Sequence, residues 1–168
     1  PGIGVGGHCI PVDPWFLVEE GKEEDTTVLV AARRANDAQP AYVAEQIERF
    51  LAPECRTVCM LGAAYKANTD DIRNAPALEV AALLLKRGFC VSVFDPLAHM
   101  GTVAAIDGSD AIVYAVPHAE FESLPSPVDL ARRMNRRHKP YLFDTTNTLP
   151  IEAWQEAGFK ARALWQSS

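Results

Sequence analysis

Apolar and polar positions divide the chain into a loop, a helical region and an alternation of strands and helices. Glycine and proline recur through the first 15 residues, where prolines 11 and 14 disfavour a regular helix or ladder, so a loop is predicted there. Helix formers dominate from Thr26 to Leu51. Apolar residues of this stretch recur at the spacing of one helix face: Val43, Ile47, Phe50 and Leu51. Pro40 interrupts it, which predicts one kinked helix or two consecutive helices.

From Thr57 onward, short apolar runs alternate with helix-forming segments. The predicted strands are TVCMLG, CVSVFDP, AIVYAV and YLFDTTN, and the predicted helices are PALEVAALLLKRG, SPVDLARRMNRR and PIEAWQEAG. Asn74 can cap the first of these helices, Pro76 lies in its first turn and Gly88 follows its end, while Ser126 opens the next. The pattern predicts an α/β fold with a Rossmann-like parallel sheet and helices on both faces, preceded by a loop and a long helical segment.

Composition and charge narrow the choice of partners. The chain has 168 residues, 16 of them basic and 22 acidic, and its formal net charge of −6 disfavours nucleic acid as a partner. One basic cluster is interpreted as a solvated helix surface; it comprises Arg132, Arg133, Arg136, Arg137, His138 and Lys139. No run approaches the roughly 18 to 20 apolar residues of a membrane span, and the start does not resemble a signal peptide, so we expect no membrane segment and a cytoplasmic location. Because the first residue is Pro1 rather than Met, we expect a piece of a longer chain.

The four cysteines are expected to be free thiols. Their spacing matches neither a zinc site nor a redox CxxC motif, so no metal site is predicted. Cys59 and Cys90 lie inside predicted strands, where a small buried hydrophobic residue is the simplest interpretation. Cys9 differs because it lies in the glycine-rich loop.

The glycines of that loop have the spacing of a dinucleotide-binding fingerprint. Gly2, Gly4 and Gly7 match GxGxxG, but the motif requires a preceding strand and a following helix, and neither is predicted here. We interpret the glycines as a surface without side chains that lets backbone and substrate approach the thiol of Cys9. Cys9 is thus a candidate nucleophile, and the alternative is a buried structural cysteine.

Two residues near Cys9 could assist it. Asp13 could hold a water, position the thiol or accept a proton, and His8 could supply a hydrogen bond. A thiol hydrolase that pairs Cys9 with His118 is a less favoured hypothesis, because nothing in the sequence brings that histidine to the loop.

A second candidate site is the segment AAYKANTDDIRNA after the first predicted strand. Ligands of open parallel sheets bind outside the carboxyl ends of the strands, where Tyr65, Lys66 and Arg73 would project. The two cations suit phosphate and the aromatic ring suits a base or sugar. Alternatively, Asp70 and Asp71 pair with Arg73 and Lys66 in a solvated loop.

One acidic residue occupies a position typical of ribose recognition. Asp95 lies at the end of the second predicted strand, CVSVFDP, where an acid often binds a ribose hydroxyl. This position alone is weak support for a ribose site.

The two motifs together resemble the UDP-glucose/GDP-mannose dehydrogenase family. GVGGHCIPVDPWFL resembles the family's active-site segment, and GAAYKANTDDIRNAPALEVA resembles the phosphate-binding segment of its C-terminal domain. ARRANDAQPAYVAEQI is similar to the central helix that carries the dimer interface, and DAIVYAVPHAEF and FDTTN resemble later strands. The resemblance implies an active-site loop segment at 1–25, a helical dimerisation region at 26–53 and a UDP-binding α/β domain at 54–168, with a homodimer formed through residues 26–51.

The resemblance also implies the chemistry. The family oxidises the C6 alcohol of a nucleotide sugar to the acid with two molecules of NAD, for surface polysaccharide precursors. Cys9 would form a thiohemiacetal and then a thioester, and Asp13 would position the water or the thiol. Gly6 would let the sugar approach, while Tyr65 and Lys66 would hold UDP.

Cofactor contacts are implied only in part. Val12 and Arg73 match family positions that reach NAD, whereas the NAD-binding domain, with the catalytic lysine and asparagine, is expected upstream of Pro1. The histidine at position 8 resembles members that oxidise UDP-N-acetylmannosamine or a related 2-acetamido sugar.

Two features depart from the family pattern. Thr146 stands where many relatives carry arginine, which puts one substrate contact in doubt, and the segment from Asp95 to Ala111 is shorter than usual. The main alternative function is a non-catalytic module that binds UDP or dimerises.

Overall fold

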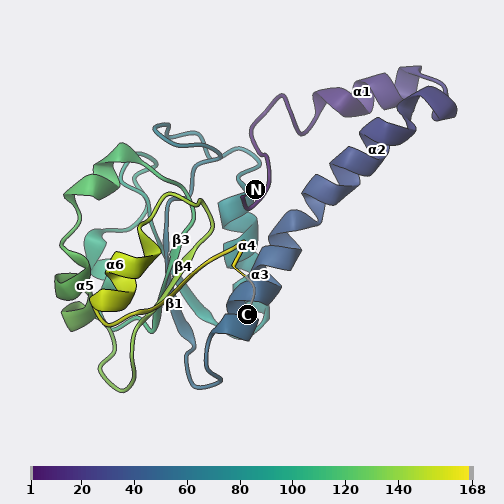
Figure 1. The fold of residues 1–168 in the computed structure, drawn as a ribbon. Coiled ribbons are helices and arrows are strands. Elements are labelled where there is room, and N and C mark those ends of the chain that lie inside the picture. Colours follow the sequence, from purple (N-terminus) through teal and green to yellow (C-terminus); the bar gives the residue numbers. More distant parts are fainter. Residues whose placement is uncertain (1, 167–168) are drawn as a thin grey trace.

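A computed structural model of the chain describes residues 2–166, without the side chains of Glu23 and Glu24, and shows an α/β body with a projecting helical arm (Figure 1). Pro1, from which a longer chain was expected, lies outside these residues. The body is built on five parallel strands in the order β2-β1-β3-β4-β5. The strands are β1 (Thr57–Leu61), β2 (Cys90–Phe94), β3 (Ala111–Tyr114), β4 (Tyr141–Asp144) and β5 (Lys160–Ala163).

Helices cover both faces of this sheet, as the sequence predicts (Figure 1). On one face lie α3 (Gln39–Phe50) and α4 (Pro76–Lys86), and on the other lie α5 (Pro127–Arg133) and α6 (Ile151–Glu156). Two short 3-10 helices, η1 (Val103–Ile106) and η2 (Ala119–Ser123), lie in the connections around β3. The predicted Rossmann-like parallel α/β fold is confirmed.

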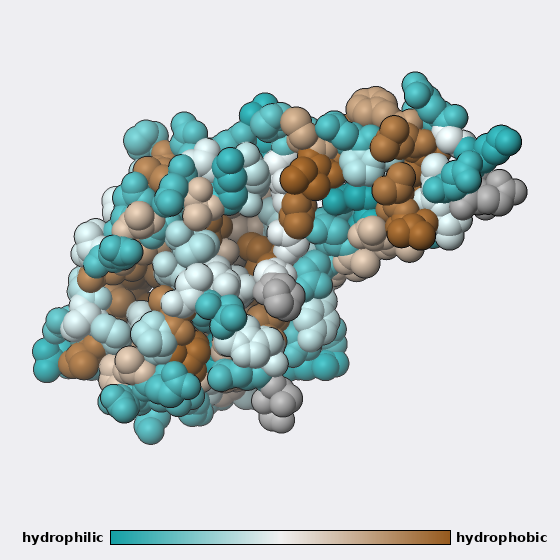
Figure 2. All heavy atoms as spheres, turned by 45° about the horizontal axis from the view of Figure 1, so that its top comes forward, coloured by the Kyte–Doolittle hydropathy of each residue, from teal (hydrophilic) through white to brown (hydrophobic). Residues whose placement is uncertain are grey.

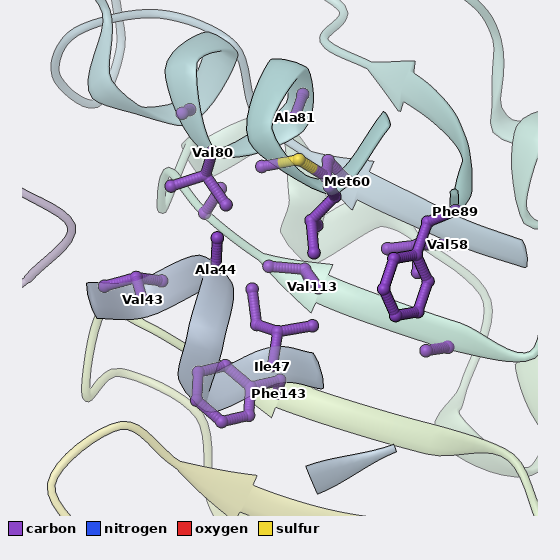
Figure 3. Close-up of a cluster of buried hydrophobic side chains, with 14 of the residues drawn as sticks. Val43, Ala44, Ile47, Val58, Met60, Val80, Ala81, Phe89, Val113 and Phe143 are labelled. Atoms are coloured by element: carbon purple, nitrogen blue, oxygen red, sulfur yellow. The ribbon is translucent and has the colours of Figure 1, made fainter. Parts of the chain in front are cut away.

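The apolar face of α3 is part of this core. Ile47 is fully buried and packs with Met60, Val113 and Phe143 of the sheet and with Val80 of α4 (Figure 3). Burying an aliphatic or aromatic side chain of this size contributes about 1.5 to 3 kcal/mol, so this face is firmly held in the body. It is therefore not available to a second copy of the chain.

The projecting arm consists of two antiparallel helices, α1 (Asp13–Glu20) and α2 (Glu23–Asp37) (Figure 1). The predicted loop therefore ends at residue 12 rather than 15, because Pro14 lies in the first turn of α1, where proline is tolerated. Helix α2 begins three residues before Thr26. A break at Ala38 separates it from α3, so the helical region forms two consecutive helices.

Helix boundaries in the body are partly as predicted. Gly88, with φ +85°, follows the end of α4, and the Ser126 hydroxyl accepts a hydrogen bond from the amide of Asp129 at 3.3 Å. The prediction that Asn74 caps α4 is wrong. Ala75 occupies the N-cap without a side-chain bond, and Asn74, with φ +47°, directs its amide elsewhere.

The secondary structure from α5 onward differs from the prediction in two places. Helix α5 stops at Arg133 instead of Arg137, so the basic cluster continues beyond the helix and is not one helix surface. Within it, His138 is half-buried, and its Nε2 lies 3.0 Å from Oδ1 of Asp110. Strand β5 was not predicted.

The cysteines are free thiols, as predicted. Cys59 is fully buried in the central strand β1, but the prediction of a buried Cys90 is wrong, because that residue opens the edge strand β2 and is exposed. Among the described helices, none combines the length and apolar character required to cross a membrane.

Candidate functional site

Two segments far apart in the sequence lie against each other: the glycine loop (residues 2–12) and the β1–α4 loop (residues 62–75). The amide of Gly7 donates to the carbonyl of Arg73 at 3.2 Å, and the side-chain amide of Asn74 donates to the carbonyl of Gly7 at 3.0 Å. The structure thus brings together the two motifs that the sequence marks as candidate sites.

Glycine at positions 6 and 7 permits this close contact. A Cβ atom on Gly6 would lie 2.2 Å from the carbonyl oxygen of Asn74 and 2.6 Å from Cδ of Pro76. Gly7 adopts φ +97°, and a Cβ there would lie 2.9 Å from the ring of Tyr65. The glycines are required by backbone packing, and the approach of a sugar to Gly6 stays a prediction.

Side chains at the junction of α2 and α3 hold the start of the glycine loop. Oδ1 of Asn36 accepts a hydrogen bond from the amide of Val5 at 2.7 Å, and its Nδ2 donates to the carbonyl of Val5 at 3.0 Å. Nε2 of Gln39 donates to the carbonyl of Gly2 at 3.0 Å. Sequence reasoning missed these contacts; the signal was a pair of carboxamide residues beside a proline in the helical region.

Cys9 is exposed at the turn that leads into α1, so the alternative of a buried structural cysteine is wrong. Its carbonyl accepts hydrogen bonds from the amides of Val12 at 2.9 Å and Asp13 at 2.8 Å. Asp13 is the first residue of α1 and is also exposed, which leaves its carboxylate accessible. The thiol and the carboxylate therefore lie on one accessible turn.

Arg73 is held by an ion pair next to this turn. Its guanidinium donates to both carboxylate oxygens of Asp71, with Nη2 2.6 Å from Oδ2, and Nδ1 of His8 lies 3.7 Å from the same oxygen. The hydrogen bonds from Arg73 lower the pKa of Asp71 to about 2. The same hydrogen bonds raise the pKa of Arg73, so the ion pair stays charged on both sides.

The alternative interpretation, in which both cations of the loop form ion pairs with its aspartates, is correct for Arg73 but not for Lys66. Neither Lys66 nor Asp70 forms an ion pair with any residue that the structure describes. Lys66 is exposed, and its Nζ lies 5.4 Å from the ring centroid of the half-buried Tyr65. A cation and an aromatic face are thus presented together at the carboxyl end of β1.

The interpretation of Asp95 as a ribose-binding acid is wrong. Its side chain is fully buried, and its carboxylate accepts hydrogen bonds from backbone amides and from His118. His118 is buried as well, and both of its ring nitrogens have partners, so it cannot serve Cys9 as the base of a thiol hydrolase.

Val12 faces a different space from Arg73. It lines a groove of about 370 Å³ between the glycine loop and the helices, together with Val5, Arg33, Asn36 and Glu79. Arg73 is not among the residues that line it. If both residues reach NAD, the cofactor must extend across the glycine loop.

The two departures from the family pattern have structural counterparts. Thr146 donates through its amide and its hydroxyl to Oδ1 of Asp144, both at 2.7 Å, and so closes the turn after β4. The connection from β2 to β3 contains only the short η1. Within residues 2–166 no cluster of three metal-ligating side chains is found.

Comparison with known proteins gives matches along most of the chain. Residues 59–151 match the UDP-binding domain of the UDP-glucose/GDP-mannose dehydrogenase family, and residues 1–38 match its central domain. The UDP-N-acetyl-D-mannosamine dehydrogenase of Methanocaldococcus jannaschii is 35% identical over 170 residues, which cover 98% of this chain and 39% of that protein.

Solved structures give the same result. The UDP-D-ManNAc dehydrogenase of Pyrococcus horikoshii superposes with a TM-score of 0.80 at 35% identity, covering 97% of this chain and 39% of that one. The NDP-N-acetyl-D-galactosaminuronic acid dehydrogenase of Methanosarcina mazei Go1 has a TM-score of 0.79 at 28% identity, with 97% and 38% covered. The chain spans about two fifths of the length of these relatives.

Proposed function

The chain belongs to the UDP-glucose/GDP-mannose dehydrogenase family, and from this premise we propose that it supplies the catalytic thiol and the UDP-binding loop of an NAD-dependent nucleotide-sugar 6-dehydrogenase. One observation carries the proposal. The glycine loop, which bears the exposed Cys9, is hydrogen-bonded to the β1–α4 loop, which presents Tyr65 and Lys66. A nucleophile and a diphosphate-binding surface on neighbouring loops are what such a reaction requires.

The chemistry follows from a thiol placed beside the sugar. Oxidation of the C6 alcohol to an aldehyde removes a hydride and a proton; Sγ of Cys9 then adds to the aldehyde carbon and forms a thiohemiacetal. Loss of a second hydride and proton gives a thioester, and attack by water releases the carboxylate and frees the thiol. Asp13, accessible on the same turn, would position that water or accept its proton.

The residues present fit a partial contact with NAD, and two molecules of NAD, bound in succession, would each accept one hydride. The side chain of Arg73 is 63% exposed, and its bonds to Asp71 use Nε and Nη2, which leaves Nη1 for a cofactor phosphate or amide. Val12 would contact NAD from its groove. We attribute the remaining cofactor contacts, including a GxGxxG fingerprint, to a domain outside these 168 residues.

We propose UDP-N-acetylmannosamine as the substrate. The support is that relatives at 35% identity bear the name UDP-N-acetyl-D-mannosamine dehydrogenase, together with an exposed His8 beside Cys9. Gly6 lies at the floor of the same loop, where the sugar would pass. A cytoplasmic location stays a prediction.

Removing the Lys66 ammonium should weaken UDP binding. We expect isothermal titration of the chain with UDP to show binding, and Lys66→Ala to weaken it about ten- to hundredfold, because a charge-assisted bond to phosphate contributes roughly 1.5 to 3 kcal/mol. Lys86→Ala is the matched control, since that lysine is exposed at the far end of α4.

The control should bind UDP as the wild type does. Absence of UDP binding by the wild-type chain would contradict the proposed function, and equal affinities for the two lysine variants would remove Lys66 from the site.

We propose a homodimer formed through the helical arm, that is, through α1 and α2. Of the predicted interface at residues 26–51, this surface includes only the part that belongs to α2. No residue of α1 is buried, and Phe16, Leu17 and Val28 are 61%, 60% and 78% exposed. Figure 2 shows hydrophobic side chains gathered on the arm. Such a concentration of exposed apolar side chains is typical of an interface.

Sedimentation velocity of the wild-type chain at micromolar concentration should give twice the protomer mass. Val28→Glu should give the protomer mass, because it places a charge in the apolar interface. Val128→Glu should not change the mass, because this valine, which is also exposed, lies on α5 in the body of the molecule. A monomeric wild type would refute the dimer.

A further inference from the structure

The β1–α4 loop is anchored at its start by a buried carboxylate. Oδ2 of Asp95 accepts hydrogen bonds from the amides of Ala63 at 2.7 Å and Ala64 at 3.1 Å, and Oδ1 accepts from the amides of Leu97 at 3.0 Å and Ala98 at 2.9 Å. Burial alone would raise the pKa of Asp95, but these amides and the neighbouring histidine outweigh it and lower the pKa. The carboxylate is therefore charged and fixed by two segments.

His118 extends this anchor further into the loop. Its side chain and that of Asp95 are both fully buried, and its Nε2 lies 2.9 Å from Oδ2 of Asp95. Its Nδ1 lies 3.0 Å from the amide nitrogen of Asn68. A backbone amide can only donate, so Nδ1 accepts, and Nε2 carries the hydrogen that is donated to Asp95.

Asn68 is the far attachment point. It adopts φ +57°, and its Oδ1 accepts a hydrogen bond from the amide of Ala119 at 2.9 Å. The loop is thus fixed at residues 63–64 by Asp95 and at Asn68 by His118 and its neighbour. Tyr65 and Lys66 lie between the two attachments, on a span too short to move independently of them.

We infer that His118 is a positioning residue for the UDP site: it joins Asp95 to Asn68 and so fixes the backbone that presents Tyr65 and Lys66. The inference rests on the proposed function, which assigns UDP to that loop. His118 itself is buried, so it would act through the loop backbone rather than by contact with UDP.

Two conservative substitutions separate the two bonds of the imidazole. In His118→Gln, the amide nitrogen can reach the position of Nε2 and still donate to Asp95, but no acceptor remains for Asn68. In His118→Asn, the amide oxygen can take the position of Nδ1 and accept from Asn68, but Asp95 loses its donor. Asp95 keeps its four backbone amides there, but a buried charge loses one donor, which should cost more than the loss of an acceptor for the part-buried amide of Asn68, so this second variant should be the less stable one.

The test measures UDP affinity by calorimetry, thermal stability, and amide hydrogen exchange of residues 65–68 for the wild-type chain and both variants. We expect His118→Gln to keep the higher melting temperature of the two variants, to bind UDP about tenfold more weakly, and to exchange these amides about tenfold faster. His118→Asn should melt at a lower temperature yet bind UDP within about threefold of the wild type. A merely structural role predicts instead that affinity follows melting temperature.

The outcomes are distinguishable from those for the proposed function. If the wild type binds UDP and His118→Gln binds it equally well, with unchanged exchange at residues 65–68, the inference is overturned. If the wild type does not bind UDP, the proposed function fails. The amide exchange rates of residues 65–68 then test only whether His118 anchors the loop. Unchanged rates in His118→Gln refute the anchor, and faster rates in His118→Gln than in His118→Asn support it.

Discussion

On the proposed function, replacing Cys9 by serine in a protein that joins this chain to its NAD-binding domain is expected to lower kcat by about a thousandfold or more. A serine hydroxyl is a much weaker nucleophile than a thiolate at neutral pH and has no base hydrogen-bonded to it here, so neither the covalent adduct nor the thioester forms at a useful rate. UDP affinity should change less than twofold, because the proposed UDP contacts lie on the β1–α4 loop and not on Cys9. Steady-state formation of NADH and calorimetry with UDP measure the two quantities.

The matched control is Cys90→Ser. Cys90 is also an exposed free thiol, but it opens the edge strand β2 rather than the glycine loop, and its replacement should leave kcat unchanged. A wild-type kcat for Cys9→Ser would contradict the nucleophile, and the chain would then be a UDP-binding module without a covalent role.

The architecture was predictable where hydrophobic pattern alone decides the structure. Strands β1, β3 and β4 are buried over nearly all their residues and appear in the sequence as continuous apolar runs, which only a covered parallel sheet accommodates. Gly88 was recognisable as the end of α4 because a positive φ there excludes most other residues.

Elements without such a pattern were missed. Strand β5 has the sequence KARA and owes its place to pairing with β4, which no local signal encodes. Helix α1 follows Pro11, contains Pro14 in its first turn and buries none of its residues, so neither propensity nor periodicity indicated it. Asn74 has a residue type typical of a helix cap, but its amide bonds to the glycine loop, 67 positions away.

The chemically active residues of the candidate site were predictable from the sequence, but the residues that hold them in place were not. Cys9 and Lys66 were identified because the residue types and their motifs carry chemistry. The bonds of His118 to Asp95 and Asn68 depend on the approach of loops 23 and 50 positions apart, and such pairing is visible only in three dimensions. A buried acid was for that reason mistaken for a ribose contact.

Gly6→Ala should separate the thiol from the UDP-binding loop. The added methyl group would lie 2.2 Å from the carbonyl oxygen of Asn74, so one of the two loops must move, at a cost of about 1 to 3 kcal/mol. The glycine loop is expected to shift away, because only a few hydrogen bonds hold it there. Gly2→Ala is the matched control, since its Cβ would meet only the carbonyl of Thr145 at 3.7 Å.

If Cys9 and the UDP-binding loop form one site, a ligand bound there should protect Cys9 from iodoacetamide. Mass spectrometry would follow alkylation of Cys9, with Cys90 as internal reference, with and without UDP-N-acetylmannosamine at about ten times its Kd. We expect the ligand to slow alkylation of Cys9 about tenfold in the wild type and in Gly2→Ala, to have little effect in Gly6→Ala, and to leave Cys90 unchanged. Equal rates at wild-type Cys9 with and without bound ligand would contradict the single site.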